Sequence, residues 1–180
     1  MTTRPPERIE GDGVVLRRPR AEDGEALAGA IAASLEHLRP WMDWADDEAT
    51  TPERRAAYLE RCDAGWEDGS DFAFLVLDGH ERTVLGGCGL HRRVGPRGIE
   101  IGYWVHVDHG GRGVATALAR ALTGAALALP DVDRVEIHCD AANVRSAGIP
   151  HRLGYRLDRI EDDEVSAPAE TGRSMVWVRT

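Results

Sequence analysis

The sequence predicts a mixed α/β (α+β) domain with a mostly antiparallel central sheet and one parallel crossover. The first observation is the order of strand-like and helix-like segments, β-α-α-β-β-β-α-β-α-β-β. The second is a strand, a glycine-rich turn, a helix and another strand within residues 99–139, the arrangement that connects parallel strands. The chain has 180 residues and no linker-like stretch, so we expect one domain spanning residues 1–180.

Hydrophobic spacing places the elements of the first half of the chain. We expect a strand at residues 13–18, helices at 21–38 and from 52 toward 66, and a hairpin of strands at 72–77 and 83–90. Thr51 and Pro52 mark the start of the second helix, because Thr is a good N-cap and Pro fits the first turn.

The second half of the chain alternates strands and helices. We expect a strand at residues 99–107, a helix from 114 to 129, a strand at 135–139, a short helix after Asn143, and strands near 155–160 and 174–179. The strand at 99–107 should bury one face, Ile99, Ile101, Tyr103, Val105 and Val107, and turn Glu100, Gly102, Trp104 and His106 to the other.

Composition excludes several classes of function. The net charge of −9 argues against sequence-independent binding of nucleic acid. The chain contains no lysine, which excludes a Walker phosphate loop and a Schiff-base enzyme. Cys62, Cys88 and Cys139 are widely spaced and show neither a disulfide framework nor a zinc-ligand pair. Without the apolar run of a signal peptide or a membrane span, we expect a cytoplasmic protein with no membrane partner.

A glycine-rich turn at residues 106–116 joins a predicted strand to a predicted helix. Glycines let the main chain wrap closely around an anion, and the free amides at a helix start supply donors and a positive dipole end. A pyrophosphate fits such a turn. The spacing of a dinucleotide-binding fold is not met, and neither is its array of parallel strands.

This turn resembles the acetyl-CoA loop of the GNAT N-acetyltransferases, which reads Arg/Gln-x-x-Gly-x-Gly/Ala. Gly113 and Ala115 match the two small positions, and Gly110 stands where the family has Arg or Gln. Residues 143–155 are similar to the family's last helix and following strand. Residues 34–44 look like the substrate-side segment of the branch that acetylates ribosomal-protein N-termini (RimJ/RimL type).

The resemblance implies the GNAT acyl-CoA N-acyltransferase fold and an enzyme that moves an acetyl group from acetyl-CoA, its co-substrate, to a primary amine. The acceptor would be a protein or peptide N-terminal α-amino group or a small-molecule amine, no metal would take part, and a homodimer is common. The strands at 104–107 and 135–139 would splay to admit the pantetheine arm. The implied cofactor-binding residues are Val105, Val107, Gly110, Gly111, Arg112, Gly113, Val114, Ala115, Thr116 and Asn143.

Two residues are candidates for catalysis. Glu100 would be the general base, directly or through water, or else a solvated carboxylate at a strand end. An α-amino acceptor, with a pKa of about 7.7–8.0, would need less help from a base than a lysine. The resemblance makes Ser146 the acid that protonates the leaving thiolate, with His151 as a substitute. Pro150 should kink or shorten the helix that carries Ser146.

Trp41, Met42 and Trp44 form a candidate wall for the acceptor pocket, and packing between the first two helices is the alternative. The sequence leaves two other functions open. A succinyl-CoA transferase is favoured if Arg92 or Arg93 reaches the acyl pocket. A non-catalytic acyl-CoA-binding module is the other. The stretch from His106 to His109 lacks further metal ligands nearby, and we expect no metal there.

Overall fold

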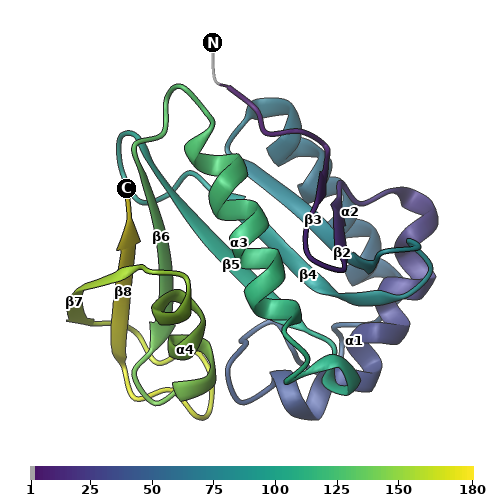
Figure 1. The fold of residues 1–180 in the computed structure, drawn as a ribbon. Helices are drawn as coiled ribbons and strands as arrows, with labels where there is room; N and C mark the ends of the chain where they lie inside the picture. The colour runs from purple at the N-terminus through teal and green to yellow at the C-terminus, as the bar shows by residue number, and fades with distance from the viewer. Residues whose placement is uncertain (1–2) are drawn as a thin grey trace.

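The structure, a computed structural model, describes residues 3–180 (Figure 1). Its strands are β1 (Arg8–Glu10), β2 (Val14–Arg17), β3 (Asp71–Asp78), β4 (Val84–His91), β5 (Gly98–Val105), β6 (Arg134–Asp140), β7 (Arg156–Asp162) and β8 (Arg173–Arg179). Its helices are α1 (Gly24–Leu38), α2 (Pro52–Asp68), α3 (Val114–Leu127) and α4 (Val144–Arg152), with 3-10 turns at Ala21–Asp23 and Val107–His109. Residues 1 and 2, part of the predicted domain, lie outside the described residues.

The eight strands found in residues 3–180 form one sheet in the order β1-β2-β3-β4-β5-β6-β8-β7. The β5–β6 pair is parallel and the other neighbouring pairs are antiparallel. The predicted mixed sheet with one parallel crossover is therefore confirmed. Strand β1 was not predicted, because three residues with a single apolar side chain, Ile9, carry too short an alternation to be recognised.

Helices cover both faces of this sheet. In Figure 1, α3 crosses the front of β4 and β5, while α1 lies behind the sheet. On the α3 side, Leu118 and Leu122 are buried against a core that includes Ile99 and Ile101 of β5. On the other side, Leu27 of α1 packs in a smaller cluster whose members are Val15, Leu27, Ala30, Leu75, Leu77 and Val84, with Ile31, Tyr58 and Trp104 against it. The sheet is thus buried on two sides, with β5 central.

The two N-terminal helices begin for different local reasons. Thr51 caps α2 as predicted, since its side chain accepts a hydrogen bond from the Arg54 amide at 3.3 Å and Pro52 occupies the first turn. The helix expected from residue 21 starts as a 3-10 turn and becomes α-helical at Gly24. At this point Asp23 accepts a hydrogen bond from the Arg20 amide at 2.6 Å.

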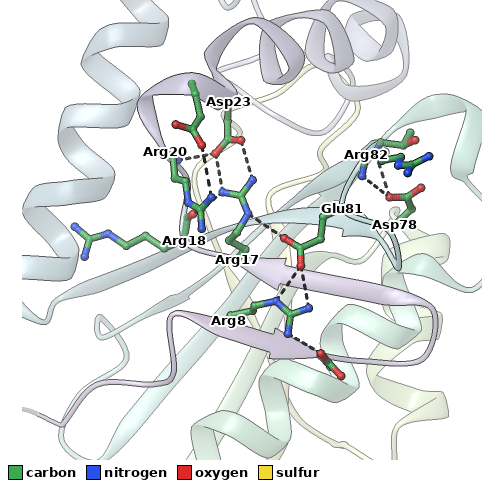
Figure 2. A network of polar contacts seen from close by, with 11 residues as sticks. Arg8, Arg17, Arg18, Arg20, Asp23, Asp78, Glu81 and Arg82 are labelled. Atoms are coloured by element: carbon green, nitrogen blue, oxygen red, sulfur yellow. Dashed lines mark hydrogen bonds and ion pairs between the residues drawn. The ribbon is translucent and has the colours of Figure 1, made fainter.

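A polar network anchors this start of α1 to the sheet (Figure 2). Arg17 of β2 donates two hydrogen bonds to Asp23, from Nη2 to Oδ1 at 2.8 Å and from Nη1 to Oδ2 at 2.9 Å. Glu81, in the turn between β3 and β4, lies 3.5 Å from Nε of Arg17 and accepts a 2.9 Å hydrogen bond from Nε of Arg8. Burial raises the pKa of Asp23, but Arg17 outweighs it and holds the pKa below the ordinary value.

The strand predicted over residues 99–107 ends at Val105, two residues early. His106 still donates its amide to the carbonyl of Leu85 at 2.8 Å, but the amide of Val107 donates to Oγ of Ser34 in α1 at 3.1 Å. Val107 therefore starts a 3-10 turn and is 40% exposed, so it does not share the buried face of β5 as predicted. None of the helices in residues 3–180 combines the length and apolar composition that a bilayer crossing requires.

Candidate active site

A cleft opens between β5 and β6, the parallel pair at the crossover. The two strands are paired only through residues 98–100 and 134–136. Beyond Glu100 and Glu136 the two strands diverge. In Figure 1 they are close together at their upper ends and separate toward the bottom of the view. The splaying that the family resemblance implied is present. It leaves the inner edge of β5 without a neighbouring strand, and that edge can pair with an extended ligand.

The main-chain amide of Val105 faces this cleft. Successive N–H groups of a strand point to opposite edges, and the next amide, His106, is bonded to Leu85 of β4. Val105 therefore points its N–H toward β6. The amide of Val107, predicted to bind the pantetheine arm, is instead bonded to Ser34. Of the two predicted main-chain contacts, the geometry favours Val105.

The glycine-rich turn lies where β5 leads into α3. Gly111 and Gly113 have φ angles of 73° and 83°, a left-handed conformation that side chains other than glycine adopt only with strain. A Cβ at either position would meet nothing within 4 Å, so the turn is open to solvent. No side chain caps α3, which leaves the amides of its first turn, from Val114 onward, as free donors. These residues fit a diphosphate.

A cavity of about 500 Å³ extends from the cleft to the far side of the sheet. Tyr103 belongs to the core on the α3 side, and Trp104 to the cluster on the α1 side. Because both line the cavity, it takes in residues from both faces at the place where β5 and β6 separate. The cofactor end and the acceptor end of a reaction can therefore meet there. The turn at residues 110–116 lies at the end of the cleft, outside this lining.

The predicted acceptor wall lies on this cavity. Trp41, Met42 and Trp44, in the segment between α1 and α2, all line it and are half-buried. Trp44 packs edge-on against Trp104 of β5, with ring centroids 6.0 Å apart. The aromatic cluster thus packs against the sheet while also facing the open space, so both interpretations made from the sequence describe part of what it does.

A row of polar side chains crosses the sheet next to the cavity, and its first three members, Asp71, His91 and Glu100, line the cavity. Asp71, His91, Glu100 and Glu136 are direct register partners on β3, β4, β5 and β6. Each has a partner: His91 Nδ1 lies 2.8 Å from Asp71 Oδ2, and Glu136 contacts Arg134 and His138 at 2.6 and 2.7 Å. Next to this row the floor is bare, because Gly89 and Gly102 face each other across β4 and β5.

Comparison with known proteins places this geometry in a family. Residues 14–156 match the family model described as an acetyltransferase (GNAT) domain. The chain belongs to the GNAT acetyltransferase family. It is an enzyme that transfers an acetyl group from acetyl-CoA to an amine.

Individual relatives cover most of the chain. It is 28% identical over 145 residues to the "Putative ribosomal N-acetyltransferase YdaF" of Bacillus subtilis (strain 168), covering 79% of this chain and 77% of that protein. The solved structure of RimL, a ribosomal L7/L12 α-N-protein acetyltransferase in complex with coenzyme A, superimposes with a TM-score of 0.86 at 18% identity, covering 96% and 97% of the two chains. The solved structure of the microcin C7 self-immunity acetyltransferase MccE, in complex with acetyl-CoA and AMP, superimposes with a TM-score of 0.84 at 15% sequence identity. The match covers 94% of this chain and 93% of that chain. These structures share the GNAT fold with this chain.

Within this GNAT domain, Glu100 is held by an arginine. Nε and Nη2 of Arg93 donate to Oε2 and Oε1 of the carboxylate, both at 2.7 Å. Burial raises the pKa of Glu100, but the hydrogen bonds and charge of Arg93 prevail and keep the pKa below its ordinary value. Glu100 lines the cavity but is buried and paired, and the solvated carboxylate considered from the sequence is not what the structure shows. A carboxylate so engaged is a weak base.

Ser146 lies on the cofactor side of the cavity, in the first turn of α4. Its Oγ is 3.2 Å from Oη of Tyr103, and its amide donates to the side chain of Asn143 at 3.2 Å. Asn143 is thus the N-cap of α4, and it also lines the cavity. Pro150 is accommodated inside a helix of nine residues, which is short as predicted. His151 is exposed, against Trp177, and is not part of the cavity lining.

Two cavity residues were not proposed as functional from the sequence. Tyr103 was assigned to the buried face of β5, where the alternation does place it, but its hydroxyl reaches Ser146, 43 residues later. His91 lies one residue beyond the hairpin strand predicted at 83–90 and was given no role, although it faces the cavity with Asp71 at its side. The stretch from His106 to His109 is a turn in which His106 Nδ1 accepts from the Asp108 amide at 3.1 Å.

Proposed function

We propose that this acetyltransferase acts on the free α-amino group of a protein or peptide. The observation that carries the proposal is the cavity of about 500 Å³ that joins the β5–β6 cleft to the wall of Trp41, Met42 and Trp44. A space of this size holds an acetyl group together with the first residues of an extended chain. The names of YdaF, a "Putative ribosomal N-acetyltransferase", and of RimL, a ribosomal L7/L12 α-N-protein acetyltransferase, support this acceptor class.

The cavity suits a cationic amine. Asp71, Glu100, Asp140 and Glu170 contribute carboxylates to its lining, and the net charge of the chain is −9. Four arginines also line it, of which Arg54, Arg55 and Arg93 are paired with Asp46, Glu25 and Glu100. An α-amino group has a pKa of about 7.7–8.0, so roughly a tenth of it is neutral at pH 7 without help. A lysine, at about 10.4, is almost entirely charged at that pH. The α-amino group is therefore the acceptor that this site activates with least cost.

On the donor side, the turn at residues 110–116 would hold the diphosphate of acetyl-CoA, mainly through main-chain amides, with Arg112 near it. The pantetheine arm would lie along the free edge of β5, near Asn143. The N–H of Val105 would then donate to the carbonyl oxygen of the acetyl group, which becomes negatively charged during the reaction. The hydroxyls of Tyr103 and Ser146, 3.2 Å apart, would face the leaving sulfur.

The acyl donor is acetyl-CoA rather than succinyl-CoA in this proposal. A succinyl carboxylate needs a free cation in the acyl pocket. Arg93 does line the cavity, but both hydrogen bonds of its fork go to Glu100, and Arg92 pairs with Asp131 at 3.1 Å. A homodimer and a cytoplasmic setting, with neither nucleic acid nor a membrane as partner, complete the proposal.

The test is a thiol-release assay with acetyl-CoA and matched peptides. One peptide has a free N-terminus and no lysine, and its control has the same sequence with an acetylated N-terminus and one internal lysine. We expect release with the first alone, and a mass increase of one acetyl group located on its first residue. Modification of the lysine peptide, or of small polyamines in preference to either peptide, would disprove the acceptor class. Succinyl-CoA in place of acetyl-CoA tests the donor.

A further inference from the structure

We propose that His91 is the base that removes a proton from the acceptor amine, and that Asp71 positions it. The inference rests on the proposed function, since it assigns a further catalytic residue to the same reaction. Neither residue belongs to the glycine-rich turn or to the helix that carries Ser146. The assignment comes from the alignment of β3, β4 and β5.

Asp71 fixes the orientation of the imidazole. The two residues face each other across β3 and β4, and the Asp71 carboxylate lies 2.8 Å from Nδ1 of His91. An ionised carboxylate accepts hydrogen bonds, so the proton of a neutral ring is placed on Nδ1. The lone pair is then on Nε2. In residues 3–180, Nε2 has no hydrogen-bond partner, and the side chain is 21% exposed toward the cavity.

The bare floor of the cavity makes room for the ring. A Cβ at Gly89 would lie 2.9 Å from Cε1 of His91, and a Cβ at Gly102 would lie 3.0 Å from Nε2. Any side chain at either position would displace the imidazole. The ring therefore lies along the surface of β4 and β5, with Nε2 reaching over Gly102 in the direction of the cleft.

This position suits a proton acceptor. Gly102 is three residues before Val105, which at about 3.3 Å per residue places Nε2 roughly 10 Å along the strand from the amide that would bind the acetyl oxygen. The reacting carbonyl, the attacking nitrogen and one bridging water fill such a span. The amine would thus lie between the donor carbonyl and His91, on the side of the sheet where the aromatic wall stands.

The groups around His91 leave it as the freest base in the cavity. Besides Asp71 on β3, the charged groups near it are Glu100 with Arg93, and Glu136 with His138 on β6. Arg54, Arg55 and Arg61 of α2 line the same cavity. Glu100 has both oxygens held by Arg93, and Nε2 of His138 is bonded to Glu136. A neutral imidazole is the side chain that most often accepts a proton in enzyme catalysis.

The protons balance. An ammonium gives one proton to Nε2 of His91, and the neutral nitrogen attacks the thioester carbon. A C–N bond forms, the C–S bond breaks, and the amide nitrogen loses a second proton, which returns through solvent to the Tyr103–Ser146 hydroxyls. The departing thiolate gains one proton from the Tyr103–Ser146 side. The net change for an ammonium acceptor is one proton released to solvent, by way of His91.

The experiment compares His91→Gln with a matched control, His80→Gln, which makes the same change at an exposed position in the β3–β4 turn. The dependence of kcat/KM on pH is measured by thiol release with the best peptide acceptor, and coenzyme A affinity by calorimetry. We expect His91→Gln to lower kcat/KM about a hundredfold at pH 7. The loss should shrink above pH 8, where the amine is neutral unaided, and coenzyme A affinity should stay unchanged. Asp71→Asn should cost about tenfold, and His80→Gln nothing.

Chemical rescue separates a base from a structural residue. His91→Ala leaves a space over Gly89 and Gly102, and added imidazole should restore part of its activity. An unchanged pH profile in His91→Gln, or no rescue of a folded His91→Ala that still binds coenzyme A, overturns the role of His91 alone. A wild-type protein that acetylates no amine in the panel overturns the proposed function, and the role of His91 with it.

Discussion

Arg93 and Glu100 are joined by two parallel hydrogen bonds of 2.7 Å across the loop that connects β4 to β5. The carboxylate is buried, whereas the side chain of Arg93 is 65% exposed. The exposed guanidinium of Arg93 therefore compensates the negative charge of the buried Glu100 carboxylate. Because both oxygens of Glu100 accept hydrogen bonds from Arg93, Glu100 is not free to act as a base, and its side chain is held in place next to His91.

Replacing Arg93 by Met should destabilise the fold in a pH-dependent way. The buried carboxylate would lose its partner, and we expect the free energy of unfolding at pH 7 to fall by about 1–2 kcal/mol, less than for a fully buried pair because Arg93 is mostly exposed. Urea unfolding measures it. Arg82→Met, at an exposed turn position, is the control and should change little.

The sign of the pH effect follows from the pKa of Glu100. In the wild type this pKa is lowered, so the pair stabilises the fold above about pH 4.3 and loses that contribution as pH falls through the folded pKa. Without Arg93, burial is opposed only by the smaller effects of His138 and His91 and raises the pKa, so the variant loses stability as pH rises past about 4.3. The gap between the two proteins should therefore shrink below about pH 4. A gap of equal size at pH 4 and pH 7 would contradict this account.

Gly113→Asp should abolish most coenzyme A binding. The substitution places a carboxylate at the turn that would hold the diphosphate, and we expect affinity to fall by at least about tenfold. Gly113 has a φ of 83°, so backbone strain of about 1–2 kcal/mol must be separated from charge repulsion. Gly13→Asp is the matched control, because Gly13 has a φ of 73° and equally open surroundings outside the site. Equal affinities of the two variants by calorimetry would reject the phosphate turn.

The parts of the fold that the sequence predicts are those coded by local patterns. The crossover from β5 to β6 and the open turn before α3 follow from alternation, glycines and a helical repeat within residues 98–140. The cleft between β5 and β6 was predicted only through the family resemblance. Strand β1 was missed because it has only three residues with a single apolar side chain, although it pairs with β2 directly across a short turn.

The contacts that give the site its chemistry depend on register. Asp71 meets His91 and Tyr103 meets Ser146 only when the strands and α4 are in place, 20 and 43 residues apart in the chain. The partner of Glu100 was missed for a different reason. Arg93 is only seven residues before Glu100, but the loop conformation that directs its guanidinium group toward Glu100 has no sequence signature.

Trp44→Leu should weaken the acceptor more than the donor. Trp44 lines the cavity and packs edge-on against Trp104 at 6.0 Å, so its loss removes apolar contact area from the acceptor wall. We expect the KM of the peptide acceptor to rise about tenfold, which corresponds to ~1.4 kcal/mol, with the KM of acetyl-CoA nearly constant. Steady-state kinetics with each substrate varied in turn measures both. A rise in the KM of acetyl-CoA instead would place Trp44 on the donor side.

Tyr103→Phe and Ser146→Ala should slow the release of coenzyme A as thiol without weakening its binding. Burial raises the pKa of Tyr103 to about 12, an effect that the hydrogen bond with Ser146 only partly offsets, so its hydroxyl is protonated at neutral pH and able to donate. A thiol has a pKa near 8.5 and leaves readily, so we expect kcat at pH 7 to fall only about three- to tenfold in either variant. The two hydroxyls act as one relay, and the double variant should therefore be little worse than a single one.

Because the thiolate needs no proton above its own pKa, this defect should fade as the pH rises beyond about 8.5. Tyr155→Phe is the matched control, since Tyr155 is also buried and bonded to a hydroxyl, Thr123 Oγ1 at 2.6 Å, and its pKa is also raised to about 12. That variant should lose stability but keep its kcat. A Tyr103→Phe enzyme with wild-type kcat at every pH would mean that the sulfur departs unaided, whereas an equal loss of kcat in Tyr155→Phe would trace the defect to the core.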